Sequence, residues 1–514
     1  MEFSIEKTWK QYEAGKEHKR RIGLYETVRR NERFYRGDQW SDHSTDLPHP
    51  VFNLTRRITD YLVCAVAPDR LAITYTDDKL PFIDHAGTRQ TIQRGLRLLS
   101  QNASYRWKQN QMSSLSYQAL LDAAISGDGV FYCWWDAKHS DGQPFLGEIH
   151  TDLVDNVNLF VADVNRADLQ SQDYIILSGR ATVESLRNEA LEAGASPKDL
   201  EKIVGDNDLD PAFGSSLSYE QTGCEKATYL ICFYREGDEV VFEKSTKSYL
   251  IKKVHTGLKH YPVAYFNWHG TKNSFHGSAP VSDLIANQKY INTAYAMAMK
   301  HMSDTAFSKI IYDKSRIPEW SNEVGEAIAA MGGGNVSDAV SVVGVGSMQE
   351  GYLDLISNVI DTTKDMMGAT DSALGNEEAN NTSAILALQK VSQISLLQVK
   401  ASFCKCIGEL ATIWADMLCA YCPQERLLAV MEKDGVCADR IDYALLKNEL
   451  LRATAELEDA GQFTASSTVT LLDKLLDKQY LSVEQYLELL PAGSLGNREA
   501  LIQKIKEKGT MQNE

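Results

Sequence analysis

The fold of this chain depends most on residues 380–423, which read NNTSAILALQKVSQISLLQVKASFCKCIGELATIWADMLCAYCP. The short polar residues at its start are good helix N-caps, because their side-chain oxygens accept hydrogen bonds from the first free backbone N–H groups. The stretch then runs to Cys422 with no proline and with Gly408 as its single glycine. We therefore predict a helix over residues 382–423, a rod of roughly 60 Å at about 1.5 Å per residue.

Apolar residues cover more than one face of this predicted helix. In its second half they recur at three- and four-residue spacing, which indicates one buried stripe: Phe403, Ile407, Leu410, Trp414, Met417 and Tyr421. In its first half they spread around the helix: Ile385, Leu388, Val391, Ile394, Leu396, Leu397 and Val399. Between Thr382 and Ser402 the charged residues are Lys390 and Lys400. A helix of this kind needs protein on several sides.

Composition limits the class of protein. A chain of 514 residues exceeds one ordinary core and should divide into several regions. Its net charge of −17 argues against a protein that grips nucleic acid by neutralising phosphates, although it allows one that lets nucleic acid pass. Nine cysteines without a secretory signal indicate reduced thiols in a cytoplasm. No apolar run is long enough to span a membrane, so we expect no membrane partner.

The first half of the chain predicts a mixture of helices and strands. Helices are expected up to residue 40 and over about 53–66, 83–99, 105–126 and 183–193. β-rich runs predict strands at 130–135, 145–150, 158–162, 174–178, 227–234, 239–243, 249–254 and 263–266. Because these strands are hairpin-like neighbours without regular crossover helices, we predict an α+β region over residues 66–268 in a mainly helical chain.

A small insert between two helices follows. Pro280 lies where a first helical turn tolerates its missing N–H, which predicts a helix over 278–305. A second helix is expected within 350–370, and the two can pair as a stalk. Between them we predict a strand at 307–312, a helix at 319–331 and a strand at 339–345. Beyond residue 423 the pattern is mixed, and helices are expected at 469–476, 483–490 and 498–508.

No grouping of residues indicates catalysis or a cofactor. Cys404, Cys406, Cys419 and Cys422 suggest a zinc site, but on one helix the first and last would lie roughly 27 Å apart, so packing thiols are the better interpretation. The histidines at 255, 260, 269 and 276 match no metal signature and are interpreted as surface or loop residues. Phosphate-loop and Gly-x-Ser-x-Gly motifs are absent. We expect no enzyme, no cofactor and no metal.

Acidic residues are concentrated just before the long helix. Residues 350–382 hold one basic residue, Lys364, against seven acids: Glu350, Asp354, Asp361, Asp365, Asp371, Glu377 and Glu378. A solvated helix face is the ordinary explanation of such a run. A surface that repels phosphates, so that a duplex slides past it, is the alternative.

The order of several short motifs resembles the portal proteins of tailed bacteriophages, of the long-tailed siphophage kind. The motifs are Phe34-Tyr-Arg-Gly-Asp-Gln-Trp40, Val51-Phe-Asn-Leu54, Ser126-Gly-Asp-Gly-Val-Phe-Tyr132, Gly277-Ser-Ala-Pro-Val-Ser-Asp-Leu284, Ala373-Leu-Gly375, Asn381-Thr-Ser-Ala384, and the tail Leu471–Leu490 with Pro491. The resemblance implies a wing (1–268, with a return at 424–460), stem helices (278–305 and 350–370), a clip (306–349), a tunnel loop (371–381), a long spine helix (382–423) and a helical crown (461–514).

The same resemblance implies a function. Such subunits form a dodecameric ring at one capsid vertex of the virion, assembled in the host cytoplasm. The ring is a channel for double-stranded DNA without sequence specificity, a docking platform for terminase, and an attachment site for capsid or scaffold and head–tail adaptor proteins.

The resemblance also implies roles for particular residues. Glu377, Glu378, Asn380 and Asn381 would lie nearest the duplex, and Asp354, Asp361 and Asp365 would form an acidic stem. Neighbouring subunits would pack on the long helix at Ile385, Leu388, Ile394, Phe403, Ile407 and Trp414. The alternative from another class is a cytosolic helical scaffold or adaptor that binds protein partners through its long helix.

Overall fold

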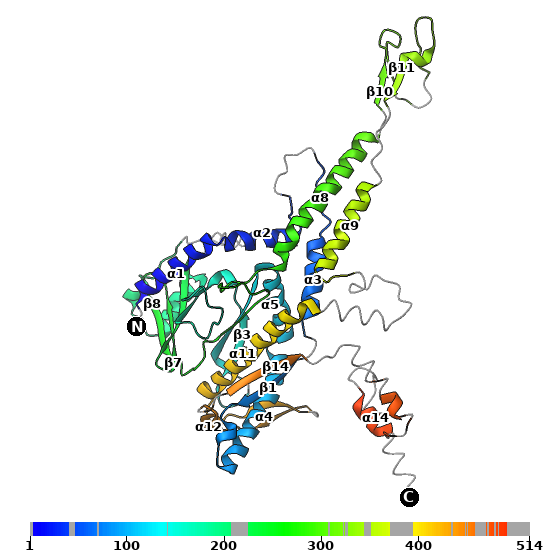
Figure 1. Cartoon of the computed structure of the whole chain (residues 1–514). Coiled ribbons are helices and arrows are strands. Elements are labelled where there is room, and N and C mark those ends of the chain that lie inside the picture. The colour runs from blue at the N-terminus through cyan, green and yellow to red at the C-terminus, as the bar shows by residue number, and fades with distance from the viewer. Residues whose placement is uncertain are drawn as a thin grey trace.

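The structure is a computed structural model that describes residues 4–40, 47–68, 71–140, 142–206, 225–306, 309–321, 323, 327–343, 351–370, 394–432, 435–447, 449, 451–457, 469, 472–476, 478, 480–481 and 483–490. A broad α+β region carries a two-helix stalk, and a small hairpin lies at the far end of that stalk (Figure 1). The α+β class expected from the sequence is confirmed.

Antiparallel strands make up the sheets of the α+β region. Their bounds are β1 Leu71–Asp77, β2 Asp128–Ser140, β3 Leu146–Leu153, β4 Leu159–Val161, β5 Tyr174–Thr182, β6 Lys226–Glu236, β7 Glu239–Ser245, β8 Leu250–His255, β9 Val263–Asn267 and β14 Leu451–Leu457. One sheet has the order β4-β5-β6-β7-β8, a second has the order β3-β2-β9, and β1 pairs with β14. Every strand predicted between residues 130 and 266 is confirmed, whereas β1 and β14 were not predicted.

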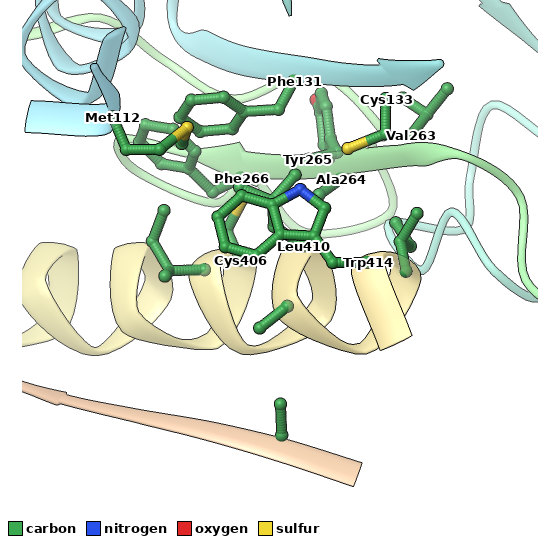
Figure 2. Packing of buried hydrophobic residues seen from close by; sticks show 14 of the residues in the cluster. Met112, Phe131, Cys133, Val263, Ala264, Tyr265, Phe266, Cys406, Leu410 and Trp414 are labelled. Atoms are coloured by element: carbon green, nitrogen blue, oxygen red, sulfur yellow. The ribbon is translucent and has the colours of Figure 1, made fainter. Parts of the chain in front are cut away.

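The main core lies around helix α11 (Leu397–Tyr421). On one side α11 packs against β2 and β9, and β14 lies on another side (Figure 2). Trp414 is fully buried there and donates from Nε1 to Thr151 Oγ1 at 3.2 Å. Gly408 permits close contact with β14, since an added Cβ would stand 2.8 Å from Ala453 O. The predicted buried stripe is confirmed at Phe403, Ile407, Leu410, Trp414 and Met417.

The predicted start of this helix needs a correction. Residues Ile394–Leu396 form a 3₁₀ turn, η6, and the α-helix begins at Leu397. Its 25 residues span about 37 Å. Residues 382–393 lie outside the described residues.

The N-terminal helices run along the α+β region. Helices α1 (Ile5–Arg21) and α2 (Leu24–Arg36) meet at Gly23, which has φ +69°, where the sequence predicted one helix. Asn53 caps α3 (Leu54–Val66) by accepting from Arg56 N, and α3 confirms the helix predicted over about 53–66. The other elements of this region are η1 Leu80–Phe82, α4 Ala86–Gln109, α5 Met112–Ser126, η2 Asn156–Asn158, α6 Val183–Glu192 and α7 Pro197–Leu200.

The stalk consists of α8 (Pro280–Thr305) and α9 (Gly351–Met366), both confirmed. Strand β10 (Lys309–Tyr312) pairs with β11 (Val340–Val343) at its tip, next to η5 (Val336–Ala339) (Figure 1). The helix predicted at 319–331 is wrong, because the described residues of that range are not helical. Residues 327–331 are exposed, and a short helix with nothing to pack against is marginal in water.

The chain after α11 returns to the α+β region. It forms a hairpin of β12 (Leu428–Glu432) and β13 (Gly435–Asp439), then α12 (Tyr443–Lys447) and β14. Further on, α14 (Val483–Leu489) confirms the helix predicted at 483–490, and the helix predicted at 498–508 lies outside the described residues. Within the described ranges, no helix combines the length and apolarity that a membrane span requires.

Candidate functional site

A buried network of amide side chains fixes the base of the stalk. On α8, Gln288 accepts from Thr55 N at 3.0 Å and donates to Asn292 Oδ1 at 2.9 Å. Asn292 donates to Gln39 Oε1 at 2.7 Å, and Gln39 donates to Asn53 Oδ1 at 3.0 Å. Buried amides bonded in this way specify one arrangement, because any other leaves polar groups unpaired. The network therefore holds α8 against the end of α2 and the start of α3.

A second buried group lies where β2 begins. The fully buried Asp128 carboxylate accepts from Asn156 Nδ2 at 3.0 Å, Asn267 Nδ2 at 3.0 Å and Gly277 N at 2.8 Å, and His276 Nδ1 lies 2.7 Å from its Oδ2. Burial raises the pKa of Asp128, but the attraction of His276 and the hydrogen bonds outweigh it, so the pKa is lowered overall. His276 lies in a loop, as expected, but it is buried there.

Two glycine turns touch at the same point. Gly127 has φ +101°, and an added Cβ would lie 2.7 Å from Gly277 O. An added Cβ on Gly277 would lie 2.9 Å from Gly127 O. The motifs at 126–132 and 277–284 are thus in direct backbone contact, and those at 34–40 and 51–54 meet through Gln39 and Asn53. Sequence reasoning identified these motifs but not that they meet at the base of the stalk.

The two stalk helices are paired by a few contacts. Asn287 Nδ2 donates to Thr363 Oγ1 at 3.0 Å, and Tyr352 OH donates to Ala294 O at 3.1 Å. Ile356 and Thr363 are buried between the helices. The position of α9 therefore depends on α8, which is fixed at its base.

The predicted acidic stem residues are exposed on α9. Asp354, Asp361 and Asp365 all face solvent in the single chain. Asp361 pairs with Lys364 at 2.9 Å, whereas Asp354 and Asp365 form no ion pair with any residue that the structure describes. The outward surface of α9 thus has acidic groups that are not neutralised within these parts of the chain.

Large apolar side chains are also exposed along the stalk and at its tip. On the stalk they are Tyr290, Met297, Met302, Leu353, Leu355 and Met366, and at the tip Ile310, Ile311, Met331, Val336 and Val342. Exposed apolar surface of this extent marks a site of association.

The residues of the long helix that were predicted to pack between subunits differ in their exposure. Phe403, Ile407 and Trp414 are fully buried in the core of their own chain, where the sequence analysis expected them against neighbours. The reason is that β2, β9 and β14 surround α11. Ile394 is 61% exposed. The predicted residues at 377, 378, 380, 381, 385 and 388 lie outside the described residues.

Two cysteines of α11, Cys406 and Cys419, are buried in the core, and Cys404 is partly buried. No disulfide joins the cysteines that the structure describes. Cys404 and Cys419 are fifteen positions apart on one helix, about 22 Å by the helical rise. Burial raises the pKa of Cys419 to about 12, so that thiol stays protonated. Among the described residues, one group brings three metal-ligating side chains together: Asp136, His139 and His150. No motif in the sequence had indicated this group, because its residues come from two strands.

These features are typical of a structural protein that assembles with partners. Its stalk is fixed at the base by buried hydrogen bonds, and the stalk exposes acidic and apolar side chains. The alternative of a scaffold that binds through its long helix is not supported, because most of α11 is inside the core. Residues 229–489, just over half of the chain, match the family model of the phage P22-like portal protein. The chain therefore belongs to the phage P22-like portal protein family.

Membership of this family makes the chain a bacteriophage portal protein, a part of the head–tail connector in the virion capsid. Proteins of the family form ring oligomers that contact capsid and DNA. The finer expectation of a siphophage type is not confirmed by the match. A comparison with curated proteins found no match.

Proposed function

We propose that this chain forms a dodecameric portal ring at one capsid vertex, through which double-stranded DNA enters during packaging and leaves during ejection. Terminase would dock on the ring, and head–tail adaptors would attach to it. The observation that carries the proposal is the exposed acidic face of α9 on a stalk whose base is fixed by buried hydrogen bonds.

The proposed division of labour follows the expected regions. The wing comprises 1–268 and 424–460, the stem helices 278–305 and 350–370, and the clip 306–349. The tunnel loop is at 371–381, the spine segment, which contains α11, at 382–423 and the crown at 461–514. Neighbouring stems would cover the exposed apolar residues of α8 and α9, which gains free energy because apolar surface leaves water.

Acidic side chains suit the wall of a channel through which DNA must slide. Lysine or arginine would displace counterions from the phosphates and hold the duplex, whereas carboxylates repel it. Asp354 and Asp365 would contribute this repulsion in the stem. Glu377 and Glu378, with Asn380 and Asn381, would contribute at the tunnel loop.

Charge reversal of the stem tests this proposal. In virions assembled with Asp354→Lys/Asp365→Lys subunits, we expect slower DNA packaging but normal rings by native mass spectrometry, because both side chains are exposed. Glu377→Lys/Glu378→Lys should act in the same direction. The matched control is Glu184→Lys/Glu201→Lys, which makes the same change of net charge at exposed residues of the wing. Equal packaging by the stem variant and this control would count against a DNA-facing stem.

Native mass spectrometry of the same preparations also gives the ring number, and a dominant species other than twelve would contradict that part of the proposal. The siphophage type stays a prediction, which electron microscopy of the virions would test by the form of their tails.

A further inference from the structure

The β2–β3 hairpin brings together three side chains that commonly bind metals. Asp136 and His139 come from β2, and His150 comes from β3. One ligand atom from each residue lies within 4.8 Å of the others. We propose that these residues bind a divalent transition-metal ion of the Zn²⁺ class through one carboxylate oxygen and two imidazole nitrogens.

An irregularity in the hairpin creates this group. The register pairs Trp134 with His150 and Asp136 with Glu148, and it shifts between Asp136 and Ser140. In a regular strand, residues three positions apart point to opposite faces, so 136 and 139 would be separated. A bulge re-aims the side chains that follow it. Here the His139 and His150 rings lie edge to face with centroids 5.7 Å apart.

The surroundings of His150 favour a further ligand. Its ring stacks on Trp134 with centroids 4.9 Å apart, which holds the imidazole in place. Its Nε2 is buried and has no hydrogen-bond partner among the residues that the structure describes. A buried polar nitrogen left unpaired costs stability, and a bound metal fixed by the histidine ligands would offset that cost.

The carboxylate of Asp136 is also held in place. Its Oδ1 accepts from Lys138 N at 3.0 Å, and its other oxygen has no hydrogen bond within the described ranges. Hydrogen bonds of this kind orient a ligating group and are common around metal sites. All three side chains are partly buried, so the group is shielded yet open to an ion from solvent.

The chemistry of the donors selects the class of metal. Ca²⁺ and Mg²⁺ prefer oxygen ligands, whereas two imidazoles with one carboxylate suit Zn²⁺ and its neighbours in the first transition row. Zn–N and Zn–O bonds of about 2.0–2.1 Å place the ligand atoms of a tetrahedron about 3.3 Å apart. The ligand atoms lie within 4.8 Å of one another, so binding would draw them closer together, and water would take the fourth position.

Zinc binding to the full-length protein tests the proposal. All measurements use a reference variant, called the parent, that carries Cys64→Ser and Cys437→Ser. These changes remove two exposed thiols that would compete for the ion. After dialysis against a chelator, the parent should bind Zn²⁺ in isothermal titration calorimetry, and its thermal unfolding midpoint should rise with added Zn²⁺. Bound Co²⁺ should give the visible bands of a tetrahedral site, and Mg²⁺ should not bind.

Two conservative variants locate the site. Asp136→Asn and His139→Gln should each weaken Zn²⁺ binding by more than about 10-fold with an unchanged circular dichroism spectrum. His85→Ala, which removes an exposed histidine at the start of α4, should bind as the parent does. The proposal is overturned if the parent shows neither Zn²⁺ binding nor a shifted midpoint, or if both variants bind as tightly as the parent.

Discussion

Replacing Asp128 should loosen the base of the stalk more than any exposed change. The carboxylate is fully buried and accepts hydrogen bonds from Asn156, Asn267 and Gly277, with His276 at 2.7 Å. Asp128→Ala leaves all of these donors buried without their acceptor. Removing one partner of a buried charged pair costs about 3–5 kcal/mol. We expect the free energy of unfolding to fall by that amount.

Asp128→Asn separates the charge from the shape. The amide keeps the size of the side chain and one oxygen acceptor, so the expected loss is about 1–3 kcal/mol, the cost of unsatisfied polar groups. The assay is urea unfolding of the unassembled full-length subunit. Asp354→Ala is the control, since its side chain is exposed and such changes stay within about 0.5 kcal/mol.

The pH dependence gives an independent measurement. Because the pKa of Asp128 is lowered in the folded state, its contribution to stability is present above the ordinary value of 3.8 and is lost as the pH falls through the lowered value. The wild type should therefore lose more stability than Asp128→Asn on acidification below about pH 4. An Asp128→Ala variant as stable as Asp354→Ala would refute the reasoning, as would parallel acid profiles for the wild type and Asp128→Asn.

Two further predictions concern the core and an acid of α5. Gly408→Ala should lower the free energy of unfolding by about 1–3 kcal/mol, because the new Cβ would stand 2.8 Å from a backbone oxygen of β14. The control is Gly87→Ala, which should be neutral because a Cβ at that position has open space around it. Equal urea midpoints for the two variants would contradict this packing. Asp122 is exposed by surface area, but desolvation by the surrounding protein atoms, then the charges of Asp155 and Glu32, raise its pKa to about 7. The contribution of this carboxyl group to folding stability is therefore present below its ordinary pKa of 3.8 and is lost as the pH rises through about 7. Relative to the wild type, Asp122→Asn should become more stable as the pH is raised from 5 to 8. A difference in urea midpoint that stays constant across that range would contradict this prediction.

Local signals in the sequence predicted the elements that depend on local chemistry. Pro280 marked the start of α8, and Asn53 marked the start of α3. In each case a single residue restricts the backbone or caps free N–H groups, so no distant partner is needed to recognise it.

Features that depend on distant partners could not be predicted in this way. Asp128 and His276 are far apart in the chain, and nothing near either residue indicates the other. The apolar faces of α11 showed that partners exist but not that β2, β9 and β14 supply them. The predicted helix at 319–331 failed for the opposite reason, because helical propensity without tertiary contacts does not maintain a short helix.

The pairing of β1 with β14 has a consequence for the synthesis of the protein. Leu71 pairs with Leu457, and Asp77 pairs with Leu451, so the stalk, its tip and α11 are all translated between the two strands. At about 5–20 residues per second, β14 leaves the ribosome roughly 20–80 s after β1. Until then β1 has an unpaired edge, which is a template for wrong pairing. The nascent subunit therefore completes its core only near the end of translation, after the exposed apolar residues of the stalk and its tip have already emerged.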